Sequence, residues 1–224
     1  MTLAALRRDL RAVADPAQAE VSQRYFKEPE RFLGIRVPDL RKVVRQHVDL
    51  PLRAVESLLA SRWHEERLAA LLILVHRYGH EPDAVYELYL RKTAHIDNWD
   101  LVDCSAPHIV GAHLFTRDRA PLYELARSAS VWERRIAILA TQHFIRNGEY
   151  ADTLRIARLL LDDRHDLIHK AAGWMLREVA NRDRTLAEQF LNEHAARMPR
   201  TMLRYAIEKF PETLRERYLA TPFR

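Results

Sequence analysis

A pattern that recurs at nearly constant spacing constrains this chain more than any other sequence feature. Five segments share a register position that is followed two places later by a small residue. Successive register positions are 36, 32, 35 and 34 residues apart, the length of a two-helix repeat. They are Arg67, Asp103, Arg135, Lys170 and Arg204. Because one such repeat cannot bury its own apolar face, the pattern predicts that neighbouring helix pairs stack, with the small residues at the close contacts.

Helical segments fit between the register positions. Only five of the 224 residues are glycine, and Leu, Ala, Arg and Glu, which favour helix, dominate the chain. The expected pairs are 52–60 with 63–78, 82–93 with 98–115, 121–128 with 131–146, 152–161 with 166–181, and 186–196 with 199–210. Extra N-terminal helices are expected at 3–13, 17–26 and 38–47. We expect Pro107 to kink or restart its helix. The sequence thus predicts an all-α fold, a curved solenoid of antiparallel helix pairs, as a single domain over residues 1–224.

The register positions are expected to share one face of the solenoid. Equivalent positions on the second helices of stacked repeats line a continuous surface, usually the concave one. That face is basic, with Asp103 as its one carboxylate. The chain has 36 Lys and Arg against 31 Asp and Glu, and its pI is about 9.5, which favours a polyanionic partner. Asp103 has two interpretations: a functional group in a basic stripe, or a pair with a neighbouring arginine that only ties repeats together.

Two tryptophans accompany this carboxylate. Trp99 lies four residues before Asp103 and therefore shares its helix face, and Trp174 follows Lys170 by one turn. A purine alkylated at N3 or N7 is cationic, and aromatic faces attract cations. An ionised carboxylate can stabilise an oxocarbenium-like sugar and position a water molecule, while arginines hold phosphates. This combination is suited to removing a charged base from DNA.

Four ordered segments carry a resemblance to a known family. They are Arg24-Tyr25 before Phe32-Leu33-Gly34-Ile35, Trp99-Asp100-Leu101-Val102-Asp103, Trp132 to Leu139, and Lys170 to Glu178. At these spacings the chain resembles, over nearly its whole length, the AlkD-like DNA alkylation repair family of HEAT-like repeat DNA glycosylases.

The resemblance implies both an activity and a set of site residues. Family enzymes excise cationic N3- and N7-alkylpurines from duplex DNA without a metal or other cofactor, and without flipping the base into a pocket. The motif match puts the catalytic aspartate on Asp103, the lesion-contacting tryptophans on Trp99 and Trp174, the lesion-side tyrosine on Tyr25, and a DNA-binding arginine on Arg135. Lys170, Arg67 and Arg204 are added as phosphate contacts from the basic face. Flanking residues such as His108 and His113 depart from the family pattern, which leaves the substrate range open.

Other features limit the remaining function classes. The single cysteine, Cys104, allows no disulfide and no cysteine-based zinc site, and the histidines show no metal-ligand spacing. Residues 1–10 do not form a secretory signal, and the most apolar stretch, 68–75, is too short to span a bilayer. We expect a cytoplasmic monomer that acts on nucleoid DNA, with no membrane partner. Two alternatives are open: a non-catalytic scaffold that binds DNA or a protein, and a binder of branched or bulky DNA without excision activity.

Overall fold

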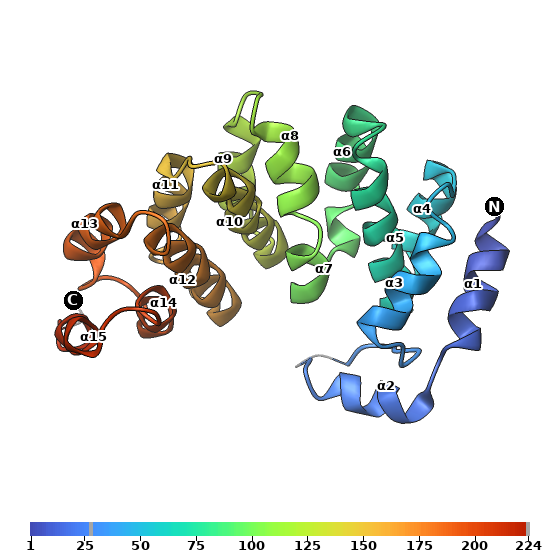
Figure 1. Cartoon of the computed structure of the whole chain (residues 1–224), viewed down its shortest axis with the longest axis horizontal. Coiled ribbons are helices and arrows are strands. Elements are labelled where there is room, and N and C mark those ends of the chain that lie inside the picture. The colour runs from blue at the N-terminus through green and yellow to red at the C-terminus, as the bar shows by residue number, and fades with distance from the viewer. Residues whose placement is uncertain (27–28, 223–224) are drawn as a thin grey trace. The chain divides into compact units, whose positions relative to one another are not determined.

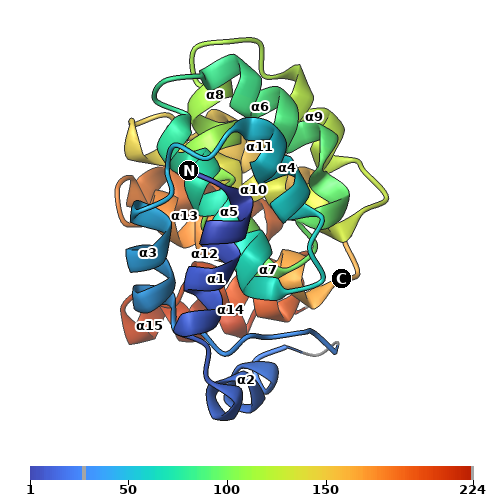
Figure 2. The same ribbon diagram turned by 90° about the vertical axis from the view of Figure 1, so that its right-hand side faces the viewer.

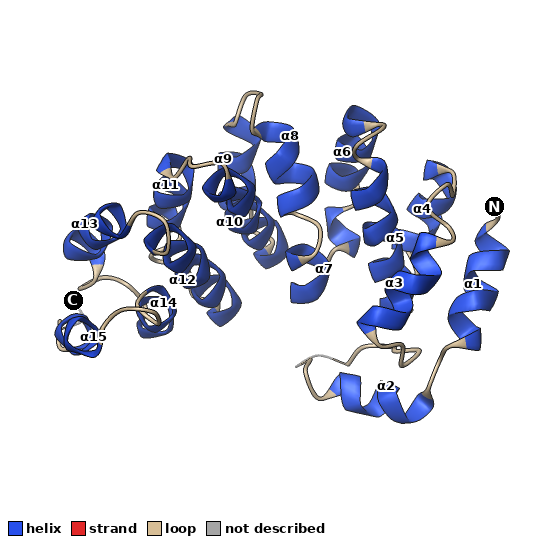
Figure 3. Cartoon of the chain, in the orientation of Figure 1, coloured by secondary structure: helices blue, strands red, loops and turns tan. Residues whose placement is uncertain are grey.

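Helices are the only regular elements among residues 1–26 and 29–222, which the computed structural model describes (Figures 1 and 3). The predicted all-α class is therefore confirmed. The chain divides into two compact units, Met1–Ser105 and Ala106–Arg224. The single domain over 1–224 and the curvature of the stack stay predictions. Within the described ranges, no helix is both long and apolar enough to cross a membrane.

The first unit is built around one long helix. Its elements are α1 (Leu3–Ala12), α2 (Pro16–Gln23), α3 (Val37–Arg45), α4 (Leu52–Leu59), α5 (His64–Arg77), α6 (Pro82–Arg91), the 3-10 turn η1 (Thr93–His95) and α7 (Trp99–Asp103). Helix α5 packs against α3, α4, α6 and α7, and its Leu71, Ile73 and Leu74 are fully buried. By contrast, α2 has no buried residue and lies apart from the other helices of this unit (Figures 1 and 2).

The second unit stacks three helix pairs. It contains the π-helical turn η2 (Pro107–Gly111), α8 (Ala112–Leu114), α9 (Ala120–Ala126), α10 (Val131–Arg146), α11 (Ala151–Leu159), α12 (Asp166–Ala180), α13 (Arg184–His194), α14 (Arg200–Ala206) and α15 (Glu212–Leu219). Helix α12 packs against α10 on one side and α14 on the other, while α9 packs against α10, α11 against α10 and α12, and α13 against α12. The second helices of successive pairs therefore form the inner contacts of this unit.

The five register positions lie at equivalent places in the observed helices. Each register residue is the fourth or fifth residue of its helix, in α5, α7, α10, α12 and α14. The small residues two places later are all buried: Ala69, Ser105, Ala137, Ala172 and Ala206. A methyl group added at Gly173 on α12 would stand 2.4 Å from the carbonyl oxygen of Met202 on α14. The predicted small residues are therefore buried, and the close approach of α12 to α14 falls at Gly173, one residue beyond Ala172.

Two elements differ from the sequence expectation. The helix expected over 98–115 is broken, because α7 ends at Asp103 and a π-helical turn begins at Pro107. Pro107 has no N–H to donate to the carbonyl of Asp103, so the helix ends there, as its proline predicted. Helix α15 was not expected, although Pro211 at its N-cap and the apolar Leu214 and Tyr218, four residues apart, indicate it.

Candidate functional site

Helix α7 holds the predicted tryptophan and carboxylate at its two ends. Asn98 caps it, accepting a hydrogen bond from the Trp99 backbone N–H at 2.9 Å, and Asp100 lies in its first turn, where negative charge is favoured. Trp99 and Asp103 are its first and last residues, one turn apart, and both side chains are half-buried. The structure confirms that these two residues belong to one helical turn.

The indole of Trp99 belongs to a cluster of rings, here called the aromatic cluster: Phe26, Phe32, His64 and Trp99. Trp99 stacks on Phe26, with ring centroids 5.6 Å apart and planes 22° apart. Phe26 in turn meets Phe32 at 5.0 Å and the edge of the His64 ring at 5.1 Å. Tyr25, the chain neighbour of Phe26, is 72% exposed. The stack thus links the segment after α2 to the start of α7.

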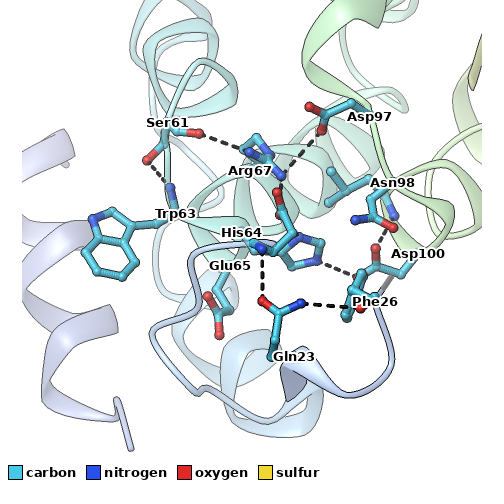
Figure 4. A network of polar contacts seen from close by, with 12 residues as sticks. Gln23, Phe26, Ser61, Trp63, His64, Glu65, Arg67, Asp97, Asn98 and Asp100 are labelled. Carbon is cyan, nitrogen blue, oxygen red and sulfur yellow. Dashed lines mark hydrogen bonds and ion pairs between the residues drawn. The ribbon is translucent and has the colours of Figure 1, made fainter. Parts of the chain in front are cut away.

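His64 joins the cluster to two carboxylates (Figure 4). Its Nδ1 lies 2.8 Å from Oε2 of Glu30, and its Nε2 lies 2.7 Å from Oδ2 of Asp100. The side chain is buried, which disfavours its charged form, but the hydrogen bonds to Asp100 and Glu30 outweigh burial and raise the pKa of His64 to about 9. At neutral pH the ring is therefore an imidazolium, and both of its N–H groups donate.

Arg67 lies inside this network. Its side chain is only 7% exposed, and its Nη2 donates to Oε2 of Glu30 at 2.5 Å and lies 3.3 Å from Oδ1 of Asp97. Burial raises the pKa of Glu30, but His64 and Arg67 outweigh it and keep this pKa below its usual value. The predicted contact between Arg67 and DNA stays a prediction. In this structure its charge is matched by carboxylates of the same unit.

Glu65 on α5 fixes the segment between α2 and α3. The carboxylate of Glu65 accepts hydrogen bonds from the backbone N–H groups of Leu33, Gly34 and Ile35, at 2.8, 2.8 and 3.1 Å. Gly34 has φ +82°, and a Cβ there would stand 1.9 Å from the carbonyl oxygen of Asp15. The motif Phe32 to Ile35 is thus explained by backbone geometry, with Phe32 contributing its ring to the aromatic cluster.

The other predicted residues lie in the second unit. Arg135 is 5% exposed and donates from Nη1 to the carbonyl oxygen of Leu167 at 2.6 Å. Lys170 pairs with Asp166 at 2.8 Å, which raises the pKa of Lys170, while the nearby charge of Arg135 acts in the opposite direction. The structure therefore brings Arg135 and Lys170 together.

Trp174 and Arg204 complete the set in the second unit. Trp174 is half-buried on α12, one turn beyond Lys170, and Arg204 is exposed on α14. The convergence of the residues of the second unit with Tyr25, Trp99 and Asp103 into one site stays a prediction.

Sequence reasoning missed four residues that surround Trp99: Phe26, Glu30, His64 and Asp100. The bonds from His64 to Glu30 and to Asp100 span 34 and 36 residues, which is one repeat length. That spacing is the signal that could have found them, since residues one repeat apart lie side by side in a helical stack. Among the described residues, no group of three or more His, Cys, Asp or Glu side chains is arranged to hold a metal ion.

These features define an all-helical protein in which a tryptophan and a carboxylate share one short helix. A family model described as DNA alkylation repair enzyme matches residues 6–210, and the chain belongs to this family. A solved structure of a predicted DNA alkylation repair enzyme from Enterococcus faecalis is similar with a TM-score of 0.72 and 17% sequence identity. The similarity covers 89% of this chain and 97% of the other. No curated protein matches the sequence.

Proposed function

We propose that this protein is a monofunctional DNA glycosylase that hydrolyses the N-glycosidic bond of cationic N3- and N7-alkylated purines in duplex DNA. The observation that carries the proposal is the single turn of α7, which starts at Trp99, ends at Asp103 and is braced by buried charges. Membership of the DNA alkylation repair family supports it. So does the presence of Asp103, Trp99, Trp174, Tyr25 and Arg135 at the positions that the resemblance assigns to the site.

The chemistry needs little beyond these groups. The alkylated base carries a positive charge, which Trp99, Trp174 and Tyr25 would face with their rings. When the bond from the sugar C1′ to the purine nitrogen breaks, its electron pair leaves with the base and neutralises that charge. The carboxylate of Asp103 would stabilise the oxocarbenium-like sugar and accept a proton from the water whose oxygen bonds to C1′.

Cationic side chains would hold the DNA backbone. Arg135, Lys170 and Arg204 lie at equivalent places on α10, α12 and α14, one repeat apart, as a row of phosphate contacts requires. Arg67 would contribute to the site by holding Glu30 and Asp97 as well as by its predicted contact with DNA. We propose that the protein acts as a monomer on chromosomal DNA in the cytoplasm.

The test is excision from a duplex carrying one N7-methylguanine, detected by alkaline cleavage of the abasic site. Asp103→Asn keeps the size of the side chain and removes its charge. We expect this variant to fold, to bind DNA at least as tightly, and to excise the base more slowly by about 10²-fold or more, the usual scale for losing a transition-state electrostatic contact.

Asp49→Asn is the matched control, because it makes the same chemical change at an exposed carboxylate between α3 and α4. It should excise at the wild-type rate. If Asp103→Asn melts at a much lower temperature but excises normally when folded, then Asp103 only links neighbouring repeats and has no catalytic role. Binding without excision by the wild-type chain would favour a non-catalytic DNA-binding scaffold.

A further inference from the structure

We propose that His64 is a positioning residue of the candidate site, holding Trp99 and α7 in place by bridging Asp100 to Glu30. This inference rests on the proposed glycosylase activity and adds to it a residue that the family motifs do not include. His64 lies on α5 and acts on the site through Asp100, Glu30 and the ring of Phe26, so we assign it a positioning role and not a catalytic one.

The contacts of His64 connect the two segments of the first unit that carry proposed lesion-binding rings, those of Tyr25 and Trp99. On one side, Nε2 bonds to Asp100, the residue directly after Trp99. On the other side, Nδ1 bonds to Glu30, in the segment that follows Tyr25 and Phe26. The backbone N–H of His64 also donates to the carbonyl oxygen of Arg31 at 2.9 Å, so main chain and side chain hold the same segment.

Aromatic packing makes the bridge rigid. The ring of His64 lies 5.1 Å from Phe26 and 4.9 Å from Phe32, and Phe26 stacks on Trp99. The side chain is 3% exposed, so water does not readily replace its hydrogen bonds. A shift of α7 would therefore break both a buried ion pair and the stack.

The bridge depends on the charge of His64. Only the imidazolium can donate from both nitrogens at once, so loss of its proton releases either Glu30 or Asp100. The charged groups of the elements around it are Arg67 on α5 and Asp97 before α7, in addition to the two carboxylates, while Glu65 points to the backbone of 33–35. Burial opposes the charge, but the hydrogen bonds and charges of Asp100 and Glu30 outweigh it and raise the pKa of His64 to about 9.

The experiment follows two quantities across pH in the full-length protein. One is single-turnover excision of N7-methylguanine, and the other is the NMR signal of the Trp99 indole N–H, assigned with Trp99→Phe. We expect both to change as the His64 ring, followed by its own NMR signal, loses its proton near pH 9. In His64→Gln, excision should fall by about 10- to 100-fold with little change in DNA affinity, as misplacement of a reacting group does, and the change near pH 9 should vanish.

His76→Gln is the control, since it makes the same substitution at an exposed position of the same helix. It should keep the wild-type rate and profile. The wild-type titration needs no variant, so the test holds even where His64→Gln does not fold. A wild-type chain without excision would refute the proposed function, and the Trp99 signal would then decide whether His64 fixes α7. If neither excision nor the Trp99 signal follows the His64 titration, the proposal is wrong.

Discussion

Four consecutive side chains at the start of α5 are buried although each can carry a charge. They are His64, Glu65, Glu66 and Arg67. Burying a charge is costly unless it is paired, and here every member has a partner outside α5. His64 bridges two carboxylates, Glu65 holds a backbone segment, Glu66 accepts from Arg7 at 3.0 Å, and Arg67 binds Glu30. One helical turn therefore fastens α1, the 29–36 segment and α7 to the core of the first unit.

The raised pKa of His64 predicts a pH-dependent stability. The folded chain holds the His64 proton to about pH 9, whereas an unfolded histidine loses it near pH 6.5. The contribution is therefore fully present below about pH 6.5 and is lost as the pH rises through about 9. Its size is about 3 kcal/mol, from the shift of the pKa. Urea unfolding should show His64→Gln to be less stable than wild type at pH 6, with a gap that shrinks toward pH 9.5.

The prediction is decided by whether the stability difference between wild type and His64→Gln changes with pH. His76→Gln should track the wild type at every pH, because His76 is exposed on the same helix. A gap that stays constant from acidic to alkaline pH would mean that the charge of His64 contributes nothing to folding.

Among the elements, ion pairs between neighbouring repeats recur at nearly one repeat length. Arg119 pairs with Asp152 at 2.6 Å across 33 residues, and Arg134 pairs with Asp163 at 2.6 Å across 29 residues. These pairs connect the N-cap of α9 with α11, and α10 with the loop between α11 and α12. Arginines such as these two hold neighbouring repeats together, and composition alone does not distinguish them from arginines that could bind DNA.

Close helix contact at Gly173 predicts a sharp mutational effect. In Gly173→Ala the new methyl group would meet the Met202 carbonyl oxygen at 2.4 Å and Cβ of Tyr205 at 2.6 Å. Since α12 and α14 would have to separate, we expect a loss of about 1–3 kcal/mol in the free energy of unfolding, the usual cost of overpacking. Gly79→Ala, which meets no atom within 4 Å, is the matched control and should be neutral or slightly stabilising. Equal melting temperatures for the two variants would contradict the close contact.

The element boundaries show what the sequence could and could not predict. Val131–Arg146 matches its expected range, and Pro107 correctly marked the break after α7. The missing information is the pairing of distant side chains. Helix periodicity predicts which residues share a helix face, but the bridge from Glu30 through His64 to Asp100 depends on how two segments pack against α5, and no local propensity determines that.

For the whole molecule, the net charge of +5 and the pI near 9.5 predict how it binds DNA. Affinity for undamaged duplex should not depend on sequence and should fall steeply with salt, because bound phosphates release their counterions. Lys170→Gln and Arg204→Gln should each weaken binding to all duplexes alike and lower the salt slope by about one. Filter binding or fluorescence anisotropy at several salt concentrations measures both quantities.

Arg158→Gln is the control for this binding experiment. Arg158 is an exposed cation of the same unit, but it lies on α11, the first helix of its pair, and not at a register position. It should leave the salt slope unchanged. If it weakens binding as much as Arg204→Gln, net charge and not the register determines where DNA binds.

The three hydrogen bonds that Glu65 accepts from residues 33–35 should also slow the exchange of these amide hydrogens with solvent. That segment has neither helix nor strand, and such segments usually exchange their amide hydrogens with solvent within seconds. Here the amides of Leu33, Gly34 and Ile35 all donate to one buried carboxylate, so we expect them to open together when the Glu65 side chain moves. In deuterated water this irregular stretch should hold its protons as long as the helices that flank α5, and should release them together.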